Sequence, residues 1–184
     1  MQAPKFWYTP RGWQSTILGP IGALYVVATA RRQKRVKPTQ LNIPVICIGN
    51  LNVGGTGKTP TTIALAQYLT SQNIAVHIVS RGYGGSLRSV TQVDPRAHTA
   101  EETGDEPLLM AAFAPTWVAD SRVAGARAAQ QAGAEVILLD DGFQDPSLSK
   151  DISIVVVNAQ RGFGNGLCLP AGPLREPAQV GMQR

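Results

Sequence analysis

The sequence has few cysteines, few aromatic residues and no long uninterrupted run of apolar residues. Its 184 residues include two cysteines, Cys47 and Cys168, which cannot form the disulfide framework of a small secreted domain. Cys47 lies in an apolar run and is expected in the core. Hydrophobic residues make up 43% of the chain and charged residues 16%, which excludes a disordered protein. The length and composition fit a folded domain with a sizeable core.

Acidic residues are absent from the first 38 positions. That segment holds seven of the 17 lysines and arginines, so residues 39–184 hold the other ten together with all 12 acidic residues, a net charge of −2. A nucleic-acid-binding protein usually carries its basic surface on the folded domain. The distribution of charge therefore argues against nucleic acid as a partner. It also divides the chain into an N-terminal segment, residues 1–38, and a body, residues 39–184.

The N-terminal segment combines apolar residues at helical spacing with a basic end. Its most apolar part, residues 17–30, is short for a bilayer-spanning helix, which needs about 20 apolar residues. One helix face would carry Trp13, Ile17, Leu18, Ile21, Leu24 and Tyr25. The basic cluster at 31–37 suits anionic lipid, so the pattern favours an interfacial membrane helix. A core-packing helix, a secretory signal and a single span are the alternatives.

A glycine-rich loop between a predicted strand and a predicted helix carries the clearest chemistry. Residues 44–49 form a short apolar run typical of a buried strand, and residues 60–68 have a helical pattern. The loop between them consists of Asn52, Val53, Gly54, Gly55, Thr56, Gly57, Lys58 and Thr59. In such a loop the backbone amides approach phosphate oxygens, the lysine reaches the β- and γ-phosphates, and the threonine hydroxyl binds Mg²⁺. The sequence therefore predicts a site for ATP and Mg²⁺.

One position departs from the usual phosphate-loop pattern. Asn52 occupies the place of the first glycine. Because asparagine tolerates a left-handed backbone better than most residues, we expect the loop still to form.

Carboxylates follow another predicted strand. Asp140 and Asp141 come directly after the predicted strand at 135–139. An aspartate at a strand end beside a phosphate loop is the usual magnesium ligand. Taken alone, two aspartates after a strand would indicate a turn, but together with the glycine-rich loop at 52–59 they favour metal binding. Asp105 opens a helical stretch, and from the residues alone it is predicted to cap that helix.

The remaining segments complete an alternating pattern. Residues 75–80 form a strand that leads into Arg81-Gly82-Tyr83, which by itself is compatible with a plain turn. Residues 118–122 end a further short strand and cap a helix that covers 122–132, and the last strand covers 152–157. Alternating strands and helices predict an α/β fold with a parallel sheet and helices on both faces.

Five segments in this order resemble the tetraacyldisaccharide 4′-kinase (lipid A 4′-kinase) family of Gram-negative bacteria. They are residues 48–60 with the phosphate loop, Ser80-Arg81-Gly82-Tyr83, Gly104-Asp105-Glu106-Pro107, Asp140-Asp141-Gly142-Phe143-Gln144, and the Leu-Pro-Ala-Gly-Pro-Leu-Arg-Glu-Pro run at 169–177. The likeness covers residues 41–184. It implies a P-loop NTPase-like fold preceded by an N-terminal membrane-associated helix.

The resemblance also implies an activity and roles for single residues. The family transfers the γ-phosphate of ATP to the 4′-hydroxyl of a lipid A disaccharide precursor at the cytoplasmic face of the inner membrane. By motif, Asp105, Lys58 and Asp141 look catalytic, with Asp105 accepting the sugar hydroxyl proton. Thr59 and Asp140 look like metal ligands, and Arg81, Tyr83, Arg175 and Glu176 like substrate residues.

Two features depart from the family pattern. Members are longer and supply a histidine partner for the catalytic aspartate, and neither His77 nor His98 lies in a matching position. The chain therefore resembles the N-terminal portion of such a kinase. Asn158 follows the last predicted strand, where we expect an acid.

Two other functions fit part of the sequence. A membrane-associated ATPase switch would share the phosphate loop and the basic N-terminal segment, but the ordered run at 169–177 counts against it. A catalytically silent fragment that binds nucleotide or membrane is the non-enzymatic alternative.

Overall fold

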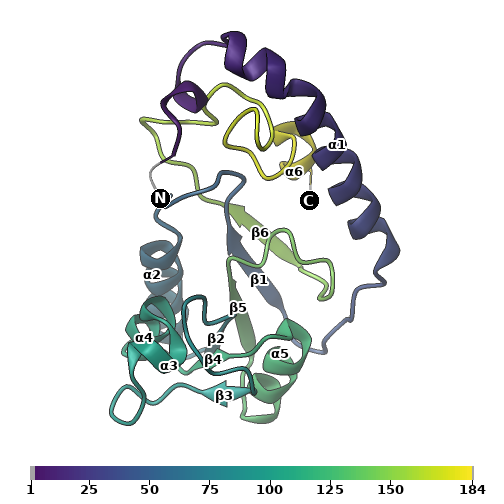
Figure 1. The fold of residues 1–184 in the computed structure, drawn as a ribbon. Helices are drawn as coiled ribbons and strands as arrows, with labels where there is room; N and C mark the ends of the chain where they lie inside the picture. Colours follow the sequence, from purple (N-terminus) through teal and green to yellow (C-terminus); the bar gives the residue numbers. More distant parts are fainter. Residues whose placement is uncertain (1–2, 184) are drawn as a thin grey trace. The chain divides into compact units, whose positions relative to one another are not determined.

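The computed structural model describes residues 3–183 and has an α/β fold. The strands are β1 (Val45–Gly49), β2 (Val76–Ser80), β3 (Thr91–Gln92), β4 (Thr116–Val118), β5 (Val136–Asp140) and β6 (Ile152–Val155). The helices are α1 (Trp13–Arg35), α2 (Lys58–Ser71), α3 (Ala100–Thr103), α4 (Asp105–Ala111), α5 (Arg122–Gln131) and α6 (Ala178–Gly181), with a 3-10 turn, η1 (Lys5–Tyr8), before α1. Figure 1 shows this arrangement.

All strands belong to one sheet with the order β3-β4-β2-β5-β1-β6. The β1–β5, β5–β2 and β2–β4 pairs are parallel, and β3 adds to β4 in the antiparallel direction. The prediction of a parallel sheet is confirmed, with an antiparallel edge that the sequence pattern did not indicate.

The chain divides into two compact units. The sheet unit contains residues 38–49 and 58–154, and the terminal unit contains residues 1–37, 50–57 and 155–184. In the sheet unit, α2 and α4 cover one face of the strands and α5 covers the other (Figure 1). The central strands form its core: every residue of β2 is buried, and the apolar Ile137, Leu138 and Leu139 of β5 are fully buried. Helices on both faces therefore agree with the sequence pattern.

The terminal unit is held together by η1, α1 and the segment after β6. The indole Nε1 of Trp7 donates to Pro170 O at 3.1 Å, and Asn165 N donates to Trp7 O at 2.7 Å. Gly22 of α1 faces Cys168 O so closely that a Cβ there would lie 3.2 Å from it. A small residue is therefore needed where α1 meets the 168–171 segment.

Helix α1 confirms the predicted helix but leaves most of its apolar face uncovered. Trp13, Ile17 and Leu24 are 72%, 65% and 71% exposed, and the buried residues of the helix are Ser15 and Gly22. Its last turns carry Arg31, Arg32, Lys34 and Arg35, where basic side chains interact favourably with the helix dipole. Within residues 3–183, no helix has the length and apolar character that crossing a bilayer requires.

Candidate functional site

The glycine-rich loop has the open shape that its sequence predicts. Gly54 and Gly57 have φ values of +111° and +95°, a region that disfavours residues with a side chain, and both are exposed. The loop is braced from within by Asn50, which is fully buried and donates its amide Nδ2 to Gly54 O (3.2 Å) and to Thr56 Oγ1 (3.1 Å). This bracing role was missed by the sequence analysis, although Asn50 lies within the motif that carries the family resemblance.

Asn52 does not use the left-handed backbone that asparagine tolerates. Among the described residues, Asn73 and Asp141 are the non-glycine residues with positive φ, and Asn52 is not one of them. Asn52 is instead buried, and its Nδ2 donates to Gly162 O at 2.9 Å. The asparagine is therefore used for its side-chain amide rather than for backbone freedom.

The start of the loop pairs with the segment that contains two predicted substrate residues. Val53 N donates to Pro173 O at 2.8 Å, and Arg175 N donates to Leu51 O at 2.7 Å. These bonds bring Arg175 and the buried Glu176 beside the first residues of the phosphate loop. The terminal unit thus joins two of the five family segments.

Lys58 and the carboxylates after β5 come together in the sheet unit. Lys58 and Thr59 open α2, and the Lys58 Nζ lies 3.7 Å from Asp141 Oδ1. Strand β5 lies between β1 and β2, so Asp140, its last residue, and Asp141, the next one, lie at the carboxyl end of a central strand. That edge is where open α/β sheets bind ligands.

Asp140 has the features of a cation ligand. It is 2% exposed, and its Oδ2 accepts a hydrogen bond from Ser80 Oγ at 3.3 Å, whereas its buried Oδ1 has no hydrogen-bond partner. Burial, with Glu106 and Asp141 adding negative charge, raises the pKa of Asp140 to about 6. A cation at Oδ1 would remove both the unsatisfied oxygen and the excess of negative charge.

These donors fit magnesium. Mg²⁺ at nucleotide sites is usually held by one or two carboxylates together with phosphate oxygens, and Asp140 with the Thr59 hydroxyl would hold it here. Residues 3–183 contain no group of three or more His, Cys, Asp and Glu side chains arranged around a common centre.

Asp105 does not cap its helix. It is the first residue of α4, the N-cap is Gly104, and no side chain makes a cap hydrogen bond. The prediction of an N-cap role is therefore wrong, because the helix begins one residue earlier than that role requires, although Asp105 does lie in the first turn, where an acidic side chain is favourable.

The loop at 81–85 packs against the turn that precedes Asp105. A Cβ on Gly85 would lie 2.5 Å from Glu102 O, and one on Gly104 would lie 2.7 Å from Tyr83 O. Ser86 N and Leu87 N donate to Glu101 O and Glu102 O. The structure thus brings the Tyr83 loop and Asp105 together through backbone contacts that only glycine permits.

Arg81 and Tyr83 line a hollow of about 380 Å³, together with Gly82, Gly84, Gly85, Arg88 and Asp120. Tyr83 is 95% exposed, and Arg88 Nη1 lies 3.6 Å from Asp120 Oδ1. Two guanidinium groups and a phenol beside an open hollow suit an anionic or hydroxyl-rich ligand.

The two histidines are engaged elsewhere. Trp117 Nε1 donates to His77 Nδ1 at 3.2 Å, and burial lowers the pKa of His77. His98 Nδ1 accepts from Asp94 N. Asn158 also has a local role, because its Oδ1 accepts from Gln160 N and Arg161 N and so forms the turn after β6.

The comparisons with known proteins agree with the motifs. The sequence model of the family described as LpxK, tetraacyldisaccharide-1-P 4′-kinase, matches residues 14–184. The chain belongs to this family.

LpxK relatives match the whole chain but extend well past it. The tetraacyldisaccharide 4′-kinase of Dinoroseobacter shibae is 62% identical over 187 residues, which cover 100% of this chain and 56% of the relative. That of Rhodospirillum centenum is 50% identical over 188 residues, with the same coverage. The chain therefore spans about half the length of the curated relatives it matches.

A solved LpxK structure shares the fold. The crystal structure of LpxK from Aquifex aeolicus, described as an "apo" form in complex with ATP, is 33% identical, with a TM-score of 0.79 over 92% of this chain and 56% of that one.

Proposed function

We propose that the chain carries the nucleotide-binding part of a tetraacyldisaccharide 4′-kinase. In this reaction the γ-phosphate of ATP is transferred to the 4′-hydroxyl of tetraacyldisaccharide 1-phosphate in lipid A biosynthesis. The observation that carries the proposal is the approach of the Lys58 ammonium to Asp141, next to the unsatisfied oxygen of Asp140, in a member of the LpxK family.

The nucleotide would be bound as in P-loop NTPases. The amides of residues 52–57 would approach phosphate oxygens, and Lys58 would neutralise the β- and γ-phosphates. Thr59 and Asp140 would hold Mg²⁺, which supplies charge neutralisation on the transferred phosphoryl group. Asp141 would keep the Lys58 ammonium oriented.

The acceptor would be bound and activated by residues of the other motifs. Asp105 is proposed to accept the proton of the 4′-hydroxyl, which is a general-base contribution of about 10²–10⁴-fold. Its side chain makes no cap bond that would compete with this role. Arg81 and Tyr83, at the hollow, and Arg175 and Glu176, beside the phosphate loop, would contact the substrate.

Residues 1–38 are proposed to attach the kinase body, residues 39–184, to the cytoplasmic face of the inner membrane. The exposed apolar side chains of α1 would enter the interface. A hollow of about 450 Å³ lined by Ala28, Arg31, Arg32, Arg35 and Val36 offers three guanidinium groups to anionic lipid heads. The attachment would be peripheral.

A direct assay tests the proposed function. The chain, and the chain extended with the remaining part of the Dinoroseobacter shibae relative, are incubated with ATP, Mg²⁺ and tetraacyldisaccharide 1-phosphate. We expect 4′-phosphorylated product from the extended protein, and loss of ATP binding in Lys58→Ala. ATP hydrolysis with dimerisation and no lipid product would favour the ATPase switch. ATP binding without transfer by either protein would favour the silent fragment.

A further inference from the structure

Asp141 has a backbone conformation that few residues other than glycine adopt. Its φ is +50°, in the left-handed region that costs about 1–2 kcal/mol for an L-residue. Such a conformation persists where the surrounding structure holds it. The conformation matters because the carboxylate of this residue is the one near Lys58 Nζ.

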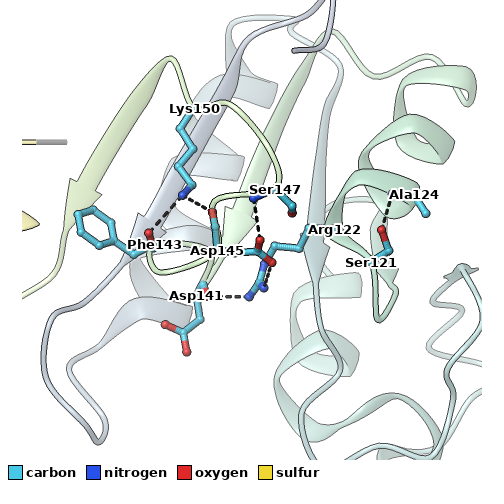
Figure 2. A network of polar contacts seen from close by, with 8 residues as sticks. All are labelled: Ser121, Arg122, Ala124, Asp141, Phe143, Asp145, Ser147 and Lys150. Atoms are coloured by element: carbon cyan, nitrogen blue, oxygen red, sulfur yellow. Dashed lines mark hydrogen bonds and ion pairs between the residues drawn. The ribbon is translucent and has the colours of Figure 1, made fainter. Parts of the chain in front are cut away.

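Asp141 is held on both sides of its peptide unit: its N donates to Ile48 O at 3.0 Å, and Arg122 binds its carbonyl. Arg122 is the first residue of α5 and is 5% exposed, and its guanidinium Nη2 donates to the backbone carbonyl of Asp141 at 2.6 Å. Its Nη1 donates to the carboxylate of Asp145 at 2.9 Å. Figure 2 shows the guanidinium between these two partners, while the Asp141 carboxylate points away from it.

The same loop is held at a second point. Lys150 Nζ donates to Phe143 O at 3.2 Å and to Asp145 O at 2.7 Å (Figure 2). Two buried or half-buried cations thus bind the carbonyls of the segment 141–145. Lys150 contacts carbonyls further along the segment, whereas Arg122 binds the backbone carbonyl of Asp141.

Besides its ion pair with Asp145, Arg122 makes a hydrogen bond that can stabilise the backbone conformation of Asp141. Burying a guanidinium is costly unless its partners satisfy it, and here Asp145 provides the opposite charge. The second nitrogen is then free to bind a carbonyl, and a hydrogen bond from a charged donor contributes about 1.5–3 kcal/mol. That is enough to offset the cost of the left-handed conformation.

We propose that Arg122 is a positioning residue for Asp141: its guanidinium keeps the Asp141 backbone left-handed, so that the carboxylate faces Lys58. The inference rests on the proposed function, because the Lys58–Asp141 pair matters only where Lys58 binds nucleotide. A planar fork is required, since one nitrogen must bind Asp145 while the other binds the carbonyl.

Arg122→Lys in the full chain tests the proposal, because lysine keeps the charge but has a single nitrogen. We expect the ATP concentration needed for half-maximal binding to rise about 10- to 100-fold, because Lys58 would no longer be oriented toward the phosphates. Arg127→Lys, an exposed arginine on the same helix, should leave it unchanged. Thermal unfolding of both variants checks that they are folded. If Arg122→Lys does not fold, Arg122→Gln with Asp145→Asn removes both charges and leaves no unpaired buried carboxylate.

A double-mutant cycle separates positioning from general stability. In an Asp141→Ala background, Arg122→Lys should change the ATP concentration needed for half-maximal binding less than twofold, because the carboxylate that it positions is gone. Equal effects of Arg122→Lys in the two backgrounds would overturn the proposal.

A crystal structure of the folded variant gives a test that does not depend on nucleotide. Asp141 is expected to leave the left-handed region and its carboxylate to move away from Lys58. A variant structure with Asp141 unchanged overturns the inference whatever the binding result. Failure of the wild-type chain to bind Mg²⁺ and ATP would instead overturn the proposed function.

Discussion

At the scale of single residues, Asn52 shows why a motif position can be filled by an unexpected side chain. Asn52→Gly restores the usual phosphate-loop residue, yet we expect it to lower the free energy of unfolding by about 1–2 kcal/mol. The variant loses the hydrogen bond to Gly162 O and gains chain entropy in the unfolded state.

Urea unfolding measures the change in the free energy of unfolding. Asn73→Gly is the matched control: Asn73 has a φ of +61°, so glycine there should be neutral or stabilising. An Asn52→Gly variant as stable as the wild type would contradict this explanation.

Asp145 gives the chain a predictable response to acid. Burial alone would raise the pKa of Asp145, but hydrogen bonds from Ser147 and Arg122 and the charge of Arg122 lower it to about 2. In the unfolded chain the value is about 3.9. The carboxylate therefore adds stability that is fully present above about pH 5 and is lost as the pH falls from about 4 to about 2. Because the group is partly exposed, we expect about 1–2 kcal/mol rather than the full shift.

Asp145→Asn should therefore lower the free energy of unfolding at neutral pH, and the difference from wild type should shrink to about half near pH 3. Urea unfolding at the two pH values measures this. Asp120→Asn, in an exposed pair with Arg88, should change stability by less than about 1 kcal/mol at either pH. A difference between Asp145→Asn and wild type that is the same at both pH values would show that the carboxylate charge is not involved.

Candidate residues could be named from the sequence where the candidacy depends on neighbours in the chain. Lys58, Thr59 and Asp140 were named as candidates because a loop–helix junction and a strand end leave recognisable patterns. Arg122 was read only as the first residue of a helix, because its partners Asp141 and Asp145 are 19 and 23 positions away. No local signal identifies such a pair. The left-handed conformation of Asp141 depends on the same distant contact.

At the scale of elements, the main strands were predictable and the small ones were not. Strands β1, β2 and β5 are apolar runs, so periodicity locates them within one or two residues. Strand β3 has two residues and exists only because it pairs with β4, so its own sequence cannot indicate it. The capping box of α3, in which the Glu102 side chain accepts from Thr99 N, was visible in the sequence and was missed.

The contact between the 81–85 loop and α3 makes a prediction at this scale. Gly85→Ala should push the Tyr83 loop off the turn before Asp105, because a Cβ would meet the backbone of residues 102–104. We expect hydrogen exchange of the Ser86 and Leu87 amides to become at least tenfold faster, since their bonds to Glu101 O and Glu102 O open. Gly19→Ala on α1, where nothing lies within 4 Å, should leave both amides unchanged. Unaltered exchange in Gly85→Ala would show that the loop is not held by this contact.

At the scale of the whole chain, the separation of charge is the property on which the proposed membrane attachment rests. Residues 1–38 carry all of the excess positive charge, while residues 39–184 are slightly acidic. A membrane with anionic lipids would attract the first segment and repel the rest weakly. This asymmetry favours an attachment in which α1 contacts the lipid surface.

Vesicle binding by the full chain tests that attachment. Arg31→Gln with Arg32→Gln should weaken binding to anionic vesicles roughly 30-fold, because each basic residue near the surface contributes about 1 kcal/mol, and should not affect binding to zwitterionic vesicles. Ile17→Ser with Leu24→Ser should weaken both, since these exposed side chains would enter the interface. Salt should reduce the preference of the chain for anionic over zwitterionic vesicles, because at about 1 M the screening length falls to about 3 Å. As a control, Arg96→Gln with Arg127→Gln removes two exposed charges from the body and should change binding to either kind of vesicle little. Equal losses from the two arginine pairs would mean that net charge, rather than α1, drives binding.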